Sequence, residues 1–193
     1  DKNIKSMASA MDENKALKDK VSELETKNSE DSSTQKEKSR KAEFSEDQLR
    51  VALKQEIGKG LAEVQREKDR VIVTVGSAGA FGSGSAKLSK QAKAIMNKIA
   101  KVSGKGAGQV NVSGHTDDVP LIFGGQYRDN WDLAAARASS VVQELSKAET
   151  IPMDKLKAIS FGETKPLEQN DSAKGREKNR RIEIEIKYWY IVY

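Results

Sequence analysis

The chain has 193 residues, a net charge of +5 and a pI near 9.2, which allows one domain of about 100–150 residues and an extension. Only 36 % of the residues are apolar and 33 % are charged. This composition excludes a chain that is globular along its whole length and indicates a polar segment outside the hydrophobic core. The lack of cysteine excludes disulfide and thiolate chemistry, and one histidine cannot build a typical zinc site without several carboxylates. No window approaches the roughly 20 apolar residues of a membrane-spanning helix.

Residues 1–43 are predicted to form a polar stalk. They carry ten basic and ten acidic residues, so the net positive charge belongs to the remainder of the chain. The few large apolar residues recur at helical spacing but break the heptad once, so a weak coiled coil and a solvated, partly helical or disordered stalk remain as alternatives. Residues 27–41 contain no apolar side chain and are expected to be a flexible linker.

An ordered domain is predicted over residues 44–193. Ser45 with Gln48 three residues later fits a capping box, and Phe44 fits the hydrophobic staple beside it. Apolar residues then recur every three or four positions, which predicts an amphipathic helix over 44–64. Two glycines weaken the second half of this helix by roughly 1 kcal/mol each.

The rest of the domain alternates strands and helices. Strands are predicted over 71–75, 109–113, 156–161 and 182–187, helices over 88–102 and 130–145, and a long polar loop over 162–178. The last strand alternates isoleucine with charged residues, and the tail KYWYIVY either extends it or is foreign to the natural chain. The order α-β-α-β-α-β-β predicts an α/β two-layer sandwich, a mixed four-stranded sheet with helices on one face.

A strand, a glycine- and serine-rich loop and a helix follow one another over residues 71–102. This succession is also found in phosphate-binding loops. Neither GxGxxG nor GxxxxGK[ST] can be placed on these residues, so nucleotide binding is not expected.

The side chains best suited to bind a ligand or take part in chemistry lie in residues 111–137. Asn130, Leu133 and Arg137 share one face of the predicted helix, and helical side chains lean toward the helix N-terminus. Arg137 would therefore reach back toward the loop that holds Asp117. An acid on the loop and an arginine on the helix form a two-sided cradle, which suits a zwitterionic ligand such as an amino-acid head group.

Plainer interpretations of these residues remain open. Asp117 and Arg137 would form a structural salt bridge, and His115 would be a hydrogen-bonded structural residue. No Ser–His pair or nucleophile elbow suggests catalysis, and the acids do not follow calcium-loop spacing. The densest basic cluster, residues 174–181, lacks the aromatic residues that accompany nucleic-acid binding.

Four motifs, GHTDD, NWDLAAARA, GETKP and NRRIEI, resemble in sequence and order the OmpA-like peptidoglycan-binding domain over residues 71–186. The doubled aspartate before Pro120, the long insert before Asn130 and the segment AFGSGSAKLS narrow the resemblance to flagellar stator B subunits of the MotB/PomB family. Within that family the sequence looks most similar to the sodium-driven PomB of vibrios. The resemblance implies a non-enzymatic cell-wall anchor without cofactor or metal.

The resemblance also implies roles for single residues. Asp117 would hold the ammonium group of diaminopimelate in the peptidoglycan stem peptide, and Arg137 would pair with a carboxylate of the same residue. Asn130 would frame the pocket, and the insert 121–128 would cover it or contact another motor component. The other candidate binding residues are His115, Thr116, Leu133 and Arg181. The family often has a serine where this chain has Ala134.

The implied partners are peptidoglycan, a second copy of the chain, and a stator A subunit of the MotA/PomA type reached through a membrane segment outside this sequence. Periplasmic motor ring proteins are further expected partners, whereas nucleic acid is not. The chain is thus expected to be the periplasmic fragment of a single-pass inner-membrane protein. Three alternatives are a lipoprotein or porin wall anchor, a wall hydrolase using Asp117 and Asp118, and an electrostatic nucleic-acid binder.

Overall fold

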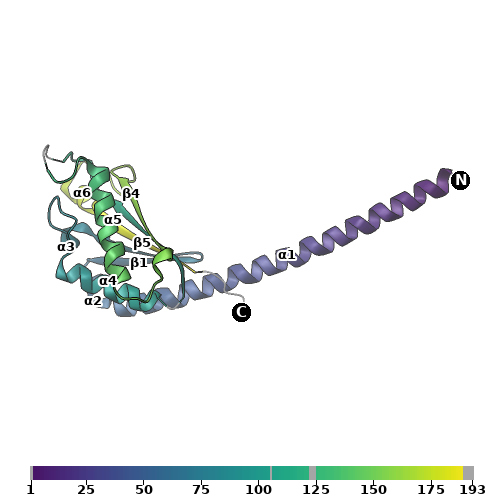
Figure 1. Ribbon diagram of the computed structural model, residues 1–193, viewed down its shortest axis with the longest axis horizontal. Helices are drawn as coiled ribbons and strands as arrows, with labels where there is room; N and C mark the ends of the chain where they lie inside the picture. The colour runs from purple at the N-terminus through teal and green to yellow at the C-terminus, as the bar shows by residue number, and fades with distance from the viewer. Residues whose placement is uncertain (1, 105, 122–124, 189–193) are drawn as a thin grey trace. The chain divides into compact units, whose positions relative to one another are not determined.

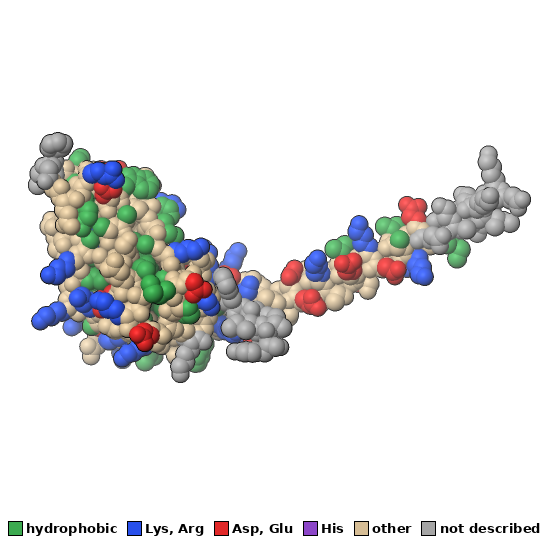
Figure 2. All heavy atoms as spheres, in the orientation of Figure 1, with side chains coloured by type: hydrophobic (Ala, Val, Ile, Leu, Met, Phe, Trp, Pro, Cys, Tyr) green, Lys and Arg blue, Asp and Glu red, His purple; other side chains and the backbone are tan. Residues whose placement is uncertain are grey.

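The computed structural model describes residues 2–104, 106–121 and 125–188. The chain divides into two compact units, Asp1–Glu37 and Lys38–Tyr193. Helix α1 (Lys2–Ala52) makes up the first unit and begins the second, and the side chains of residues 13–33 are all exposed. Figure 2 shows charges of both signs along this exposed part, with few apolar side chains among them.

The predicted flexible linker over 27–41 is helical in the structure, so that prediction is wrong. This stretch contains no glycine or proline, and lysine, glutamate, glutamine and arginine all have good intrinsic helix propensity. Among the described residues, no helix is both long and apolar enough to cross a membrane.

The second unit is an α/β domain built on one five-stranded sheet of order β1-β2-β5-β3-β4. The strands are β1 (Ala62–Glu67), β2 (Arg70–Gly76), β3 (Ala107–His115), β4 (Leu156–Gly162) and β5 (Arg181–Tyr188). The helices after α1 are α2 (Lys54–Gly58), α3 (Ser77–Ala80), α4 (Lys90–Ser103), α5 (Asn130–Ser146) and α6 (Ala173–Asn179), and Met153–Lys155 forms a 3-10 turn. Among the strands of the described residues only the β3–β4 pair is parallel, so the sheet is mixed, as predicted.

The sheet has five strands rather than the predicted four, because the helix predicted over 44–64 ends early. Helix α1 stops at Ala52, the short α2 follows, and Gly60 takes a positive φ of 69° before strand β1 begins. In the first half of β1, Ala62 and Val64 are buried and the residues that follow each of them are exposed, so Val64 belongs to the two-residue period of a strand. Leu61 and Val64 also fit a helical spacing, which is why the sequence pattern extended the helix too far.

The predicted capping box and staple are absent, because the helix does not begin there. Ser45 lies inside α1, is buried, and its hydroxyl forms a hydrogen bond with the hydroxyl of Tyr188 at the end of β5. The Phe44 side chain is 65 % exposed. The residues of the tail after Tyr188 lie outside the described part of the chain.

The two layers follow from the register of the strands. Val73, Ile184 and Val112 stand side by side on β2, β5 and β3 and are completely buried. Helices α4 and α5 cover this face (Figure 1), and their apolar residues join one core with the strands. The alternate residues Glu183 and Glu185 of β5 are partly exposed on the other face, as the alternating sequence predicted.

One close contact fixes the position of α5 on the sheet. A Cβ atom added to Gly114 of β3 would lie 2.2 Å from the backbone oxygen of Ala134 in α5. Glycine therefore lets the helix backbone rest directly on the strand. The same contact sets where α5 presents its first two turns relative to the loop that follows β3.

Candidate binding site

A cleft of about 680 Å³ lies where β3 ends and α5 begins. It brings together five of the seven residues predicted as binding residues: Thr116, Asp117, Asn130, Leu133 and Arg137. The opposite walls come from α3 and the glycine-rich loop after it, and from helix α6 with the residue that follows it. These walls contribute Ser77, Ala78, Phe81, Gly82, Ser83, Gly84, Arg176 and Arg180.

Asp117 forms the acidic side of the cleft and follows directly after β3. Its Oδ2 pairs with Nη1 of Arg180 at 2.5 Å, and its Oδ1 accepts a 3.3 Å hydrogen bond from the backbone N–H of Val119. The side-chain amide of Asn130 donates to the carbonyl oxygens of Asp117 and Val119, at 3.3 and 3.1 Å. Asn130 thus holds the loop in place, while Asp129 caps α5 by accepting from the backbone N–H of Asp132 at 2.9 Å.

Arg137 forms the basic side of the cleft and is only 4 % exposed. Its Nε donates to the carbonyl oxygen of Ser85 at 3.0 Å, and its guanidinium lies 5.1 Å from the ring centre of Phe81. Burial lowers the pKa of Arg137, and the nearby charge of Arg180 adds to this effect. No carboxylate of the described residues pairs with it, so the expected alternative of an Asp117–Arg137 salt bridge is not formed.

His115 and Arg181, the other two predicted residues, do not line the cleft. His115 is 1 % exposed, its ring stacks on Phe161 at 5.2 Å, and its Nε2 lies 3.6 Å from a carboxylate oxygen of Glu183. The guanidinium of Arg181 donates to the other oxygen of Glu183 at 2.7 Å and to the backbone of Lys165 at 3.2 Å. Both side chains belong to a buried cluster at the end of the sheet.

Arg180 and Arg176, by contrast, line the cleft without having been predicted. The signal for Arg180 was present in the sequence. Successive side chains of a strand point to opposite faces of the sheet. Because Ile182 faces the helices, Arg181 faces the other side, and Arg180 is expected to face the helices again. Arg176 gave no such signal, because α6 is too short to show a periodic pattern and its residues were predicted to be a loop.

The cluster around Glu183 predicts a dependence of stability on pH. His115 and then Arg181 lower the pKa of Glu183 from its ordinary 4.5 to about 2. Stability from the ionised carboxylate is therefore fully present above pH 4.5 and is lost as the pH falls toward 2. We therefore expect the free energy of unfolding, measured with urea, to fall by about 1–2 kcal/mol between pH 6 and pH 3 because of this group.

In the variant Glu183→Gln the free energy of unfolding should fall by correspondingly less between pH 6 and pH 3. The matched control is Glu177→Gln, which removes an exposed carboxylate on α6. Equal pH dependence in the wild type and the Glu183 variant would contradict the assignment.

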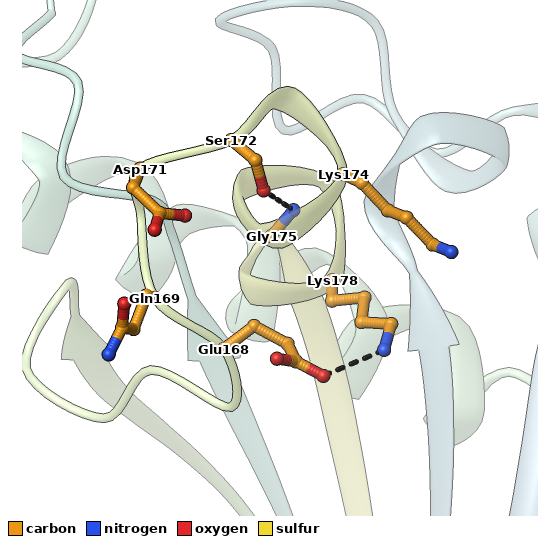
Figure 3. Close-up of a pocket in the computed structure, with 7 residues that line it drawn as sticks. All are labelled: Glu168, Gln169, Asp171, Ser172, Lys174, Gly175 and Lys178. Atoms are coloured by element: carbon orange, nitrogen blue, oxygen red, sulfur yellow. Dashed lines mark hydrogen bonds and ion pairs between the residues drawn. The ribbon is translucent and has the colours of Figure 1, made fainter.

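A second hollow, of about 370 Å³, lies on α6 and the loop before it (Figure 3). Its polar groups largely satisfy one another: Lys178 pairs with Glu168 at 2.8 Å, and Ser172 caps α6 by accepting from the backbone N–H of Gly175 at 3.0 Å. Lys174 also borders this hollow. Among the described residues, no group of three or more His, Asp or Glu side chains is placed to hold a metal ion.

The sequence model of the OmpA family matches residues 80–180, slightly more than half of the chain. These residues include GHTDD, NWDLAAARA and GETKP in full and the first two residues of NRRIEI. The chain belongs to the OmpA family. This family is non-enzymatic, as the sequence predicted.

Two relatives are similar to this OmpA-family chain over more residues than the family model covers. The uncharacterized protein YtxE of Bacillus subtilis is 30 % identical over 175 residues, which span 91 % of this chain and 72 % of YtxE. Motility protein B of the same organism is 30 % identical over 128 residues, 64 % of this chain. The chain spans about half the length of that second relative, 48 %. The relationship to MotB is thus found, whereas the narrower resemblance to PomB stays a prediction.

Solved structures agree with this assignment. The cell wall anchor of the type VI secretion system (T6SS) of Pseudomonas aeruginosa has a TM-score of 0.67 at 32 % identity, covering 72 % of this chain and 96 % of that one. The periplasmic domain of Helicobacter pylori MotB has a TM-score of 0.59 at 28 % identity, covering 66 % and 79 %. These similarities confirm the α/β fold and make the domain similar to periplasmic MotB domains.

Proposed function

We propose that this chain is a non-catalytic module that binds peptidoglycan through the diaminopimelate-containing stem peptide. The observation that carries the proposal is the buried guanidinium of Arg137, which has no carboxylate partner among the described residues and lines the same cleft as Asp117. A buried cation without a counter-ion is costly, and a ligand carboxylate would relieve that cost. The names of the relatives, a cell wall anchor among them, support this function.

In this proposal each side of the cleft binds one charge of a zwitterion. Arg137 would take a carboxylate with its two terminal nitrogens, because its Nε already donates to Ser85, whereas its Nη2 makes only a long 3.5 Å contact with the carbonyl oxygen of Gly82. Asp117 would accept the ammonium group and share its carboxylate with Arg180. Asn130 would keep the acidic loop in position, and Thr116 and Leu133 would complete the walls. His115 and Arg181 would support the turn from below the cleft.

The cellular role is a further part of the proposal. The module would fix a flagellar stator of the MotB/PomB type against the wall, in the periplasm, as a homodimer joined to a stator A subunit and near motor ring proteins. The polar residues 1–43 would act as the spacer before a domain at 44–193. The alternative is a wall anchor of a lipoprotein or porin, and the sequence upstream of this chain distinguishes them. A lipobox cysteine would favour the alternative, and one transmembrane helix with an aspartate would favour the stator.

The variant Asp117→Ala tests the binding site, and it should lose sedimentation with purified peptidoglycan by at least about tenfold, because the ammonium group loses its carboxylate. The measurement is the fraction of protein that pellets with peptidoglycan, with circular dichroism to verify the fold. The matched control is Asp118→Ala, since Asp118 is exposed and does not line the cleft.

Equal pelleting of Asp117→Ala and the wild type would show that the site is elsewhere. Release of soluble muropeptides by the wild type would instead establish an enzyme and overturn the proposal.

A further inference from the structure

The cleft contains more positive charge than one zwitterionic head group can balance. Three of its lining residues are arginines, Arg137, Arg176 and Arg180, whereas Asp117 is the single carboxylate among the described lining residues. A zwitterion adds no net charge, so its binding would leave an excess of two positive charges in the cleft. Like charges that share a partly desolvated cleft repel one another, and the charge of Arg180 already lowers the pKa of Arg137.

Arg176 and Arg180 form the side of the cleft that belongs to α6. They lie one helical turn apart, since the backbone N–H of Arg180 donates to the carbonyl oxygen of Arg176 at 3.1 Å. One nitrogen of Arg176, Nη1, donates to the backbone oxygen of Asn170 at 2.6 Å, which anchors the side chain. The structure gives neither Nη2 nor Nε of Arg176 a partner in the described part of the chain. Arg180 uses Nη1 for Asp117.

We propose that Arg176 and Arg180 form a second carboxylate subsite in this cleft. The proposal rests on the proposed function and refines its ligand: a stem peptide that presents a free carboxylate in addition to the zwitterionic head held by Asp117 and Arg137. Such a ligand carries a net negative charge and lowers the excess positive charge of the cleft from two to one. The module therefore distinguishes stem peptides with this carboxylate free from those in which it is amidated.

The chain supplies a matched control on the same helix. Lys174 lies two residues before Arg176 and carries the same charge, but it borders the second hollow rather than the cleft (Figure 3). The variant Lys174→Gln thus changes the net charge of α6 by the same amount as Arg176→Gln. It leaves the lining of the cleft intact.

The test is calorimetric titration with a synthetic diaminopimelate tripeptide and two derivatives, each with one carboxylate outside the zwitterionic head converted to a carboxamide. Wild type and Lys174→Gln should bind the parent peptide about tenfold more tightly than at least one derivative, because a charge-assisted pair is lost. In Arg176→Gln the preference for the parent peptide over that derivative should vanish, and the affinity for the derivative itself should be unchanged. Arg176→Lys keeps the charge and should keep most of the preference, which separates the effect from any disturbance of the Asn170 loop.

Two results would overturn the inference while leaving the proposed function standing. One is equal affinity of the wild type for the parent peptide and both amides. The other is an equal loss of preference in Lys174→Gln and Arg176→Gln, which would make the effect one of overall charge. A wild type that binds neither the tripeptide nor whole peptidoglycan would overturn the proposed function and the inference together.

Discussion

Replacing Arg137 with methionine is expected to weaken peptidoglycan binding by roughly 100-fold, since truncating one member of a desolvated charge pair commonly costs 2–5 kcal/mol. The same change should not lower the stability of the domain. The guanidinium is buried without a carboxylate partner among the described residues, and methionine fills similar space without a charge to desolvate. The measurements are peptidoglycan sedimentation and the thermal midpoint of the same preparation.

The conservative variant Arg137→Lys is the control for charge. Lysine keeps the positive charge but cannot make a bidentate contact, so we expect binding between that of the wild type and that of the methionine variant. A methionine variant that binds normally would remove Arg137 from the site. A methionine variant that melts well below the wild type would show that the arginine serves the fold.

Replacing Gly114 with alanine is expected to cost about 3 kcal/mol of unfolding free energy, equivalent to roughly 10 °C in the thermal midpoint. The added Cβ would meet the backbone oxygen of Ala134 at 2.2 Å, and backbone cannot move aside as a flexible side chain can. Because that contact positions α5, the substitution should also displace Asn130 and Arg137 and so weaken peptidoglycan binding. Thermal unfolding followed by circular dichroism measures the first effect.

Gly76→Ala is the matched control for this glycine. Gly76 ends strand β2, its φ of −65° suits alanine, and a Cβ there would have no atom within 4 Å. Its thermal midpoint should stay within about 2 °C of the wild type. Equal stability of both glycine variants would mean that α5 is free to move away from the sheet.

Patterns within single elements predicted most of the domain. The alternation of isoleucine and charge in residues 182–187 predicted β5, and the apolar spacing predicted α4 and α5 almost to their ends. The pattern failed where two periods fitted the same residues, as at Leu61 and Val64. It also failed at α3 and α6, because elements of four and seven residues are too short to show a period.

For the candidate site, the sequence by itself determined the two charges of the cradle, Asp117 and Arg137, and the helix face that carries Asn130. These follow from spacing along one short stretch, where helix geometry fixes the relation between positions. Only the tertiary structure decided that Asp117 pairs with Arg180 and that Arg137 is buried without a carboxylate partner in the described chain. The physical reason is that a counter-ion is chosen by distance in space. Residues 117 and 180 come together only because β5 lies between β2 and β3 in the folded sheet.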